Sequence, residues 1–247
     1  METRSKKNDN AEKLKIIPIQ EEDQKLDIER PLHPNLPNIY RGQLVCIVAP
    51  IRSGKSTIWN NMLLNDNFYN DLFPQDAVTI ISNTIRSDSS ARFAYQKYKT
   101  NCHDIYSDKI IKDLIKRQKA KLENKEKKTG FCLILDDLLG NFPKQGRRGM
   151  EAIHFATRFR HFCKRGSPCM VIYSSQNFTD INPIIRNNAT AFLISGNIRN
   201  VREIETITHT FCDSFGGSEN FNQMLTEVRS KGPYHWLHLR LDSCPPQ

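Results

Sequence analysis

The sequence lacks the features that mark membrane-spanning and secreted proteins. No apolar run in its 247 residues approaches the roughly 20 residues that a spanning helix needs, and the mean hydropathy is −0.57. The first ten residues, METRSKKNDN, do not contain the apolar core of a signal peptide. These absences predict an intracellular protein that is not secreted and has no membrane partner.

Metal-ligand and hydrolase motifs are also missing. The seven cysteines include no C-x-x-C pair and their number is odd, which argues against both a zinc ribbon and a disulfide framework. Cys46 and Cys132 lie inside apolar runs and are expected to be small buried thiols. No H-E-x-x-H or G-x-S-x-G motif offers a competing chemistry.

Basic residues are in excess, and their position along the chain is informative. The formal net charge is +9, yet residues 1–30 hold seven Lys/Arg against eight Asp/Glu, so the excess belongs to residues 31–247. It is concentrated in Lys109–Lys128, with nine basic and three acidic residues, and in Lys144–Arg165, with seven and one. A basic core indicates a polyanionic partner, although solvated helix faces would give the same composition.

The apolar pattern predicts an α/β fold. Continuous apolar runs, typical of strands buried on both faces of a parallel sheet, alternate with helical periodicity. The expected strands are Gln43–Pro50, Asp76–Ser82, Phe131–Leu135, Cys169–Ser174 and Ala189–Ser195, and residues 233–242 alternate as a final, antiparallel edge strand. Helices are expected from Gly54 onward and over Met150–Lys164 and Arg199–Cys212. We therefore expect a mobile N-terminal arm (1–30) and one domain (31–247) with helices on both faces of its sheet and a basic helical insertion at about 107–128.

A phosphate-binding loop follows the first expected strand. The segment APIRSGKS (Ala49–Ser56) has the Walker A form G-x-x-x-x-G-K-[ST], with Ala49 at the usual first glycine. Such a loop directs backbone N–H groups and a helix N-terminus at phosphate oxygens, while its Lys reaches the terminal phosphates and its hydroxyl binds Mg²⁺. The predicted ATP-binding residues are Pro50, Ile51, Arg52, Ser53, Gly54, Lys55, Ser56 and Thr57. Arg52 either adds charge near the phosphates, faces a neighbouring subunit, or is a solvated loop residue.

Two carboxylates and an amide are the expected partners of this loop in a RecA-like P-loop NTPase. Asp136 ends a buried strand and is interpreted as the Walker B residue, which supports the Mg²⁺ cofactor together with Ser56. Asp137 stands where many such ATPases carry a Glu that polarises the attacking water, although a loop or helix-cap carboxylate is the alternative. Gln176, at the end of CMVIYSSQ, is the candidate γ-phosphate sensor, with Ser174 and Ser175 as alternatives.

These motifs, in this order, resemble the genome-packaging ATPases of large double-stranded DNA viruses and their virophages (the poxvirus type), members of the FtsK–HerA superfamily. The matching features are APIRSGKST, CLILDDL, the Arg160-His161 pair, IYSSQ and INPIIRNNATAFLISG, which cover roughly residues 40–200. Ala49 departs from the pattern, and the basic insertion and the C-terminal portion show little likeness. The resemblance implies a ring-shaped homo-oligomeric motor that moves duplex DNA into a preformed capsid.

The resemblance also implies partners, a location and one more catalytic residue. The partners would be double-stranded DNA, further copies of the chain and a capsid or portal component, in the host cytoplasm at viral factories or in the virion. Arg160 would act as an arginine finger in the neighbouring subunit's site, with Arg158 as the alternative.

Two other functions are compatible with these motifs. A nucleotide or nucleoside kinase, or another ATPase that does not translocate DNA, would share the loop. A structural DNA-binding protein with a degenerate loop is disfavoured because Lys55, Ser56 and Asp136 are all present.

Overall fold

The computed structural model describes residues 30–138, 150–243 and 246. The expected N-terminal arm therefore lies outside the described residues, apart from Arg30, and so do residues 144–149 of the second basic stretch. Within the described part, the strands are β1 (Gln43–Val48), β2 (Val78–Ser82), β3 (Cys102–His103), β4 (Phe131–Asp136), β5 (Cys169–Ser175), β6 (Ala191–Ser195) and β7 (Trp236–Arg240). The α-helices are α1 (Lys55–Leu64), α2 (Arg92–Lys97), α3 (Asp108–Glu123), α4 (Met150–Arg158), α5 (Pro183–Asn188), α6 (Val201–Phe211) and α7 (Ser218–Ser230).

Short 3-10 helices join these elements. They are η1 (Ile39–Arg41), η2 (Gln75–Ala77), η3 (Ser89–Ala91), η4 (Lys99–Asn101), η5 (Phe159–Phe162), η6 (Phe178–Asp180) and η7 (Cys212–Phe215). None of the helices in the described part of the chain is long and apolar enough to cross a lipid bilayer.

The described strands form one mostly parallel sheet in the order β3-β2-β4-β5-β1-β6-β7. Only β7 is antiparallel, and it pairs with β6 at the edge, which confirms the predicted C-terminal edge strand. Every residue of β1, β2, β4, β5 and β6 is buried, whereas burial alternates along β7, as the apolar patterns predict. Because the other strands are parallel, their ends define two edges, named here the carboxyl edge and the amino edge.

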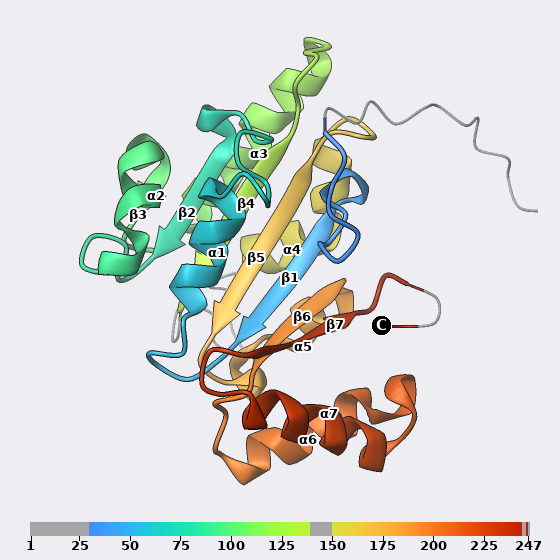
Figure 1. Ribbon diagram of the computed structural model, residues 1–247. Coiled ribbons are helices and arrows are strands. Elements are labelled where there is room, and N and C mark those ends of the chain that lie inside the picture. Colours follow the sequence, from blue (N-terminus) through green and yellow to red (C-terminus); the bar gives the residue numbers. More distant parts are fainter. Residues whose placement is uncertain (1–29, 139–149, 244–245, 247) are drawn as a thin grey trace, which may run out of the picture.

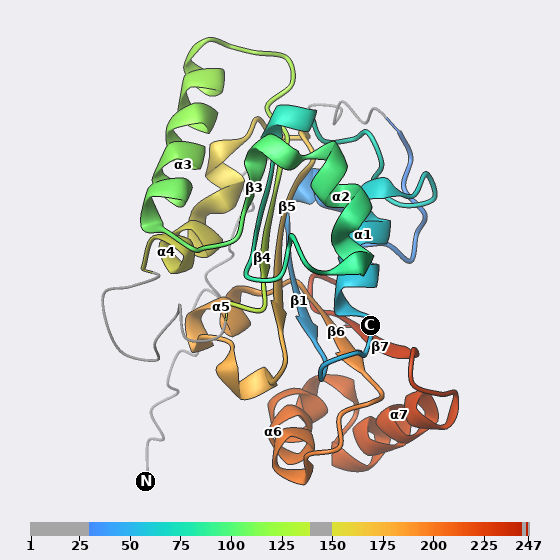
Figure 2. The ribbon, with the colours of Figure 1, turned by 90° about the vertical axis from the view of Figure 1, so that its left-hand side faces the viewer.

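Helices cover both faces of the sheet (Figure 2). One core packs Trp59, Met62 and Leu63 of α1 and Ala94 of α2 against one face, with side chains such as Val45. The opposite core contains buried residues of the other five α-helices, from Ile111 in α3 to Leu225 in α7. The sheet is therefore enclosed between two helix layers, and the loops that follow its parallel strands lie at its carboxyl edge.

The predicted helix Met150–Lys164 is too long in the observed fold. The α-helix ends at Arg158 and η5 replaces its last part. Phe159 and Phe162 are both buried and three residues apart, the spacing that a 3-10 turn places on one side, and Phe162 stacks on Phe155 with ring centroids 5.4 Å apart. Burial of Phe159 and Phe162 on the same side of the chain therefore accounts for the change from an α-helix to a 3-10 helix.

The sequence pattern does not predict three of the observed elements, α2, β3 and α7. In α7 only Phe221 and Leu225 are buried, so the sequence has too few apolar residues at helical spacing to predict the helix. Strand β3 has two residues, and α2 has six with only Ala94 buried.

Candidate nucleotide-binding site

The loop between β1 and α1 has the geometry of an anion-binding turn. Gly54 has a φ of 88° and is the N-cap of α1 without a side-chain cap, so no side chain occupies the first-turn N–H groups. These donors, with the positive end of the helix dipole, attract a phosphate group. A side chain at position 54 would be strained, because L residues rarely adopt that φ.

Lys55 is folded into its own loop. Its side-chain Nζ donates to the carbonyl oxygens of Ala49 (2.9 Å) and Pro50 (3.3 Å), and the residue is only 9% exposed. Burial lowers the pKa of Lys55, and the negative charges of Asp137 and Asp136 oppose this effect. The two predicted carboxylates therefore act electrostatically on the predicted phosphate-binding lysine.

Asp136 is a buried carboxylate at the end of β4. Its Oδ2 accepts a hydrogen bond from Ser82 Oγ at 2.9 Å, and its Oδ1 has no hydrogen-bond partner among the described residues. Burial raises the pKa of Asp136, against the opposing effects of the nearby Ser174 hydroxyl, which is not within hydrogen-bonding geometry, and of the hydrogen bond from Ser82. An unpaired buried carboxylate oxygen is costly, and a divalent cation would satisfy it. The residue thus fits the predicted role in supporting Mg²⁺.

Asp137 and Gln176 are brought into direct contact. Gln176 Nε2 donates to Asp137 Oδ2 at 2.7 Å, and the backbone N–H of Asp137 donates to the carbonyl oxygen of Ser174 at 3.0 Å. The φ of Asp137 is 50°, a left-handed conformation that costs a non-glycine residue on the order of 1 kcal/mol. In this conformation its side chain meets Gln176, the residue directly after the neighbouring strand β5.

Lys55, Asp136 and Asp137 line a cavity of about 620 Å³ at the carboxyl edge. Its lining includes seven of the eight predicted ATP-binding residues (all but Pro50), together with Asp136 and Asp137. Pro50 lines an adjoining hollow with Gln176. Strand β5 lies between β1, which leads into the phosphate loop, and β4, which ends in the carboxylates. The carboxylates and the phosphate loop are therefore one strand apart in the sheet.

Sequence reasoning missed the third wall of this cavity. Thr84, Ser87, Asp88 and Ser90, from the segment that follows β2, also line it. Because β2 is parallel to β4 and pairs with it, its carboxyl end opens onto the same edge. The polar run directly after the apolar DAVTIIS is the signal that identifies them. Arg199, which lines the adjoining hollow together with Gln176, was also not among the predicted site residues.

Arg160 is placed away from this cavity. Its side chain packs beside Gly42, where its Cγ lies 2.8 Å from the position that a Cβ on that glycine would take. Cys169, the first residue of β5, contacts the same position, so Arg160 lies near the start of β5. The nucleotide cavity is at the other end of the same strand, roughly 20 Å away at about 3.3 Å per residue. Arg158 is exposed, and its Nε donates to the carbonyl oxygen of His154 in its own helix. The structure therefore brings neither arginine to the cavity of its own chain.

The sheet, the loop and the carboxylate arrangement together define the fold of a P-loop ATPase. The DNA-packaging ATPase B204 of Sulfolobus turreted icosahedral virus has a similar structure, with a TM-score of 0.54 and 20% identity over 83% of this chain and 95% of that one. The genome-packaging NTPase B204 of Sulfolobus turreted icosahedral virus 2, solved with AMP, gives a TM-score of 0.53 and 19% identity over the same shares. The same protein has also been solved with ATP-gammaS.

This likeness confirms, at the level of the fold, the resemblance to viral packaging ATPases. No family model matches the chain, and no curated protein matches it in sequence.

Proposed function

We propose that this chain is an ATP-driven translocase that packages a double-stranded DNA genome into a preformed viral capsid. The observation that carries the proposal is the convergence of Lys55, Asp136 and Asp137 on one cavity at the carboxyl edge, with Gln176 hydrogen-bonded to Asp137 from the adjoining hollow. The fold shared with viral packaging ATPases supports it.

ATP hydrolysis follows from the roles of these groups. Lys55 would leave its two carbonyl partners and bind the terminal phosphates. Asp137 would accept a hydrogen bond from the attacking water, and Gln176, bonded to Asp137, would couple that carboxylate to the γ-phosphate. Ser56 and Asp136 would hold Mg²⁺, which neutralises charge on the phosphates when bound.

Contact with duplex DNA is supported by the basic surface around α3 and η5. Lys109, Lys112, Lys116 and Lys119 recur every three or four residues along one exposed side of α3. Both α4 and η5 pack against α3, which brings the two basic stretches of the sequence side by side. The exposed residues Arg158, Arg160, His161, Lys164 and Arg165 extend this charge.

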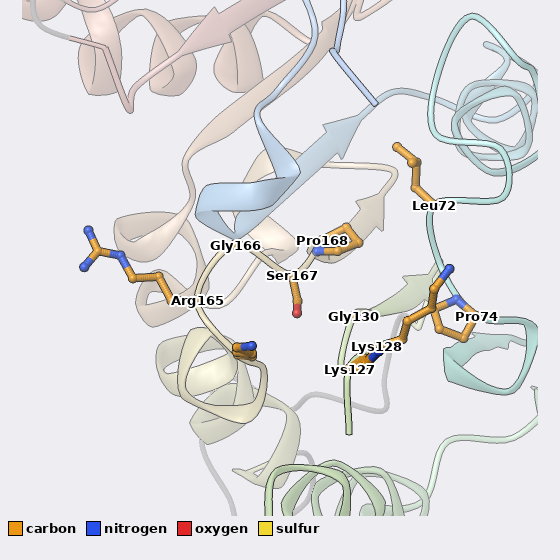
Figure 3. A pocket seen from close by; sticks show the side chains of 10 residues that line it. Leu72, Pro74, Lys127, Lys128, Gly130, Arg165, Gly166, Ser167 and Pro168 are labelled. Carbon is orange, nitrogen blue, oxygen red and sulfur yellow. The ribbon is translucent and has the colours of Figure 1, made fainter. Parts of the chain in front are cut away.

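The surface continues to the amino edge of the sheet. There a cavity of about 50 Å³ is lined by residues that include Lys127, Lys128, Lys164 and Arg165 (Figure 3). The cavity is too small for a nucleotide, so its basic rim fits contact with an extended backbone better than a small-molecule site.

A homo-oligomeric ring is the assembly that this function requires. Arg160 at the amino edge would reach the carboxyl edge of a neighbouring copy only through a heterologous, head-to-tail interface, the kind that closes into rings. A capsid or portal component would be the further partner, with the host cytoplasm at viral factories or the virion as the location. We place the motor in residues 31–247 and treat residues 1–30 as an appended arm.

The test is the ATPase rate with and without duplex DNA, combined with the particle mass in ATP. Turnover that duplex DNA accelerates, in an oligomer, supports the proposal. Turnover that depends instead on a nucleotide or nucleoside acceptor would indicate a kinase. No turnover under either condition would leave a DNA-binding protein without motor activity.

A further inference from the structure

A second, mostly apolar cavity opens directly beside the phosphate loop. Its volume is about 690 Å³, within the range of small-molecule pockets, and Ser53, Gly54 and Thr57 line both this cavity and the nucleotide cavity described above. The two spaces therefore adjoin each other at the N-terminus of α1.

The wall opposite α1 is aromatic. It includes Tyr234, two residues before the edge strand β7, and Trp236, the first residue of β7. Apolar side chains from elsewhere line most of the remainder, among them Leu36, Ile58, Met62, Phe68 and Leu193. Tyr234 is 69% exposed, and its Cδ1 lies 3.7 Å from where a Cβ on Gly54 would stand. The segment that leads into β7 passes beside the loop between β1 and α1 (Figure 1). An aromatic ring left exposed there is available to stack on a planar ligand.

One polar group of this cavity has an unused hydrogen-bonding atom. Nε2 of His238 is buried and has no hydrogen-bond partner in the described part of the chain. Burial lowers the pKa of His238, nearby Arg240 lowers it further, and Asp242 opposes them. The imidazole is therefore neutral near pH 7 and offers either an acceptor or a donor at that nitrogen.

We infer that this cavity binds the adenine base of the nucleotide, with Tyr234 stacking on the base and His238 Nε2 bonding to its edge. The inference rests on the proposed function, because it needs the phosphates to bind at Gly54 and Lys55. A nucleotide held there must place its base in a hollow that adjoins the loop, and this one combines apolar lining with exposed aromatic surface. Stacking on an aromatic side chain suits any purine.

A second hollow, of about 580 Å³, provides the internal comparison. It lies against another side of α1 and is lined by Phe93, which is 59% exposed, together with Asn60, Asn61 and Asp66 among others. It shares only Thr57 and Ser90 with the nucleotide cavity, and its lining is largely polar in residue type. Phe93 is thus a matched control: an exposed aromatic residue beside α1 that the inference does not use.

The experiment compares ATP with inorganic tripolyphosphate, which has the phosphates but no base. Binding of each to the full chain is measured with Mg²⁺ by calorimetry, for the wild type and for Tyr234→Ala, Tyr234→Phe and Phe93→Ala. We expect the wild type to prefer ATP, and Tyr234→Ala to lose about tenfold in ATP affinity while its tripolyphosphate affinity stays. Tyr234→Phe should recover most of the loss, and Phe93→Ala should bind ATP like the wild type.

Each other result overturns the inference in a recognisable way. A Tyr234→Ala variant that binds ATP normally would place the base elsewhere, and a loss in Phe93→Ala would place it in the second hollow. Equal loss of ATP and tripolyphosphate would make Tyr234 a support of the loop, and a changed particle mass with an unchanged ligand preference would make it an interface residue. Wild-type protein that binds neither ligand would refute the proposed function itself, whereas wild type that binds both equally would refute only the base pocket.

Discussion

The two edges of the sheet differ in charge, burial and backbone strain. At the carboxyl edge, Asp136 is 2% exposed with one unpaired oxygen, and Asp137 and Arg52 adopt left-handed φ angles of 50° and 61°. At the amino edge, Lys164 and Arg165 are exposed beside a turn. One edge holds strained, buried, acidic groups around a phosphate loop, and the other holds solvated basic groups.

Under the proposed function, this difference places the chemistry and the polyanion contact at opposite ends of the same strands. Buried unpaired carboxylates are costly to stability and suit a site that must bind a cation and activate water. Exposed lysines and arginines carry no such cost and suit a phosphate backbone that is gripped and released. Substitutions at the two edges should therefore affect turnover and DNA binding separately.

The largest effect is expected from Lys55→Ala. Loss of the amine that contacts the phosphates should lower the ATPase rate on the order of 10³-fold or more. The fold should persist, because the hydrogen bonds of Lys55 go only to carbonyls of its own loop. The measurement is steady-state turnover together with the melting temperature without nucleotide. A variant that unfolds would show that Lys55 is structural.

Arg160→Ala tests whether the amino edge also serves the carboxyl edge of a neighbour. An arginine acting in trans stabilises charge in the transition state, so its loss should lower turnover on the order of 10³-fold while ATP still binds. Mixing Arg160→Ala with Lys55→Ala should restore part of the activity, because some interfaces then pair an intact loop with an intact arginine.

The control for this assignment is Arg158→Ala mixed with Lys55→Ala. Recovery in that mixture alone, with confirmed subunit exchange, would move the role to Arg158. If neither mixture recovers activity, shared interfacial catalysis loses its support. The next candidate is then Arg199, which lines the hollow beside the nucleotide cavity of its own chain together with Gln176.

Asp137→Asn and Asp136→Asn should separate the two carboxylate roles. Asp137→Asn should bind Mg-ATP and turn over about 10²-fold more slowly, the usual contribution of a general base. Asp136→Asn should instead weaken Mg²⁺-dependent binding, because it removes charge from the unpaired oxygen. Normal hydrolysis by Asp137→Asn would shift the search for the base to Asp88, in the same cavity.

In the protein without nucleotide, Asp136 should also affect the stability of the fold. Because burial raises the pKa of its carboxyl, ionisation destabilises the fold, and that cost grows as the pH rises from the ordinary carboxyl pKa to the raised pKa and is constant above it. Asp136→Asn should therefore increase the free energy of unfolding by about 1 kcal/mol at pH 7, and the gain should shrink as the pH falls. Denaturant titration at several pH values measures this. A pH-independent difference would contradict the assigned cause.

The smallest effect is expected at the basic surface. Duplex DNA affinity should fall steeply with salt, with about 0.9 added to the log–log slope for each phosphate contact, and Lys116→Glu with Lys119→Glu should reduce that slope by about one to two. Arg202→Glu, exposed on α6, is the control and should leave the slope unchanged. An effect of Arg202→Glu alone would move the DNA surface, and salt-independent binding would contradict backbone contact.

Much of the architecture was predictable because its signals are local. The fully buried strands have continuous apolar runs, β7 alternates, and α3 buries Ile111 and Leu114 at helical spacing, so six of the seven described strands and α3 are evident in the sequence. The end of α4 was not, because the packing of Phe162 against Phe155 decides it. Elements with few buried residues, such as α2 and α7, have too little apolar pattern to predict.

The sequence by itself determined the phosphate loop and the identity of its partners. Gly54, Lys55 and Ser56 are adjacent in the chain, so covalent spacing alone places them at the start of a helix that follows a buried strand. The same holds for Asp136 at the end of an apolar run.

Only the tertiary structure decided how these parts meet. Strand order is set by the burial of the whole sheet, and it inserts β5 between β1 and β4, which brings Gln176 onto Asp137. The same packing places Arg160 at the amino edge and Tyr234 against Gly54. Such contacts join segments far apart in sequence, and no local pattern encodes them, because many chain paths satisfy the same local preferences while only one buries both faces of this sheet.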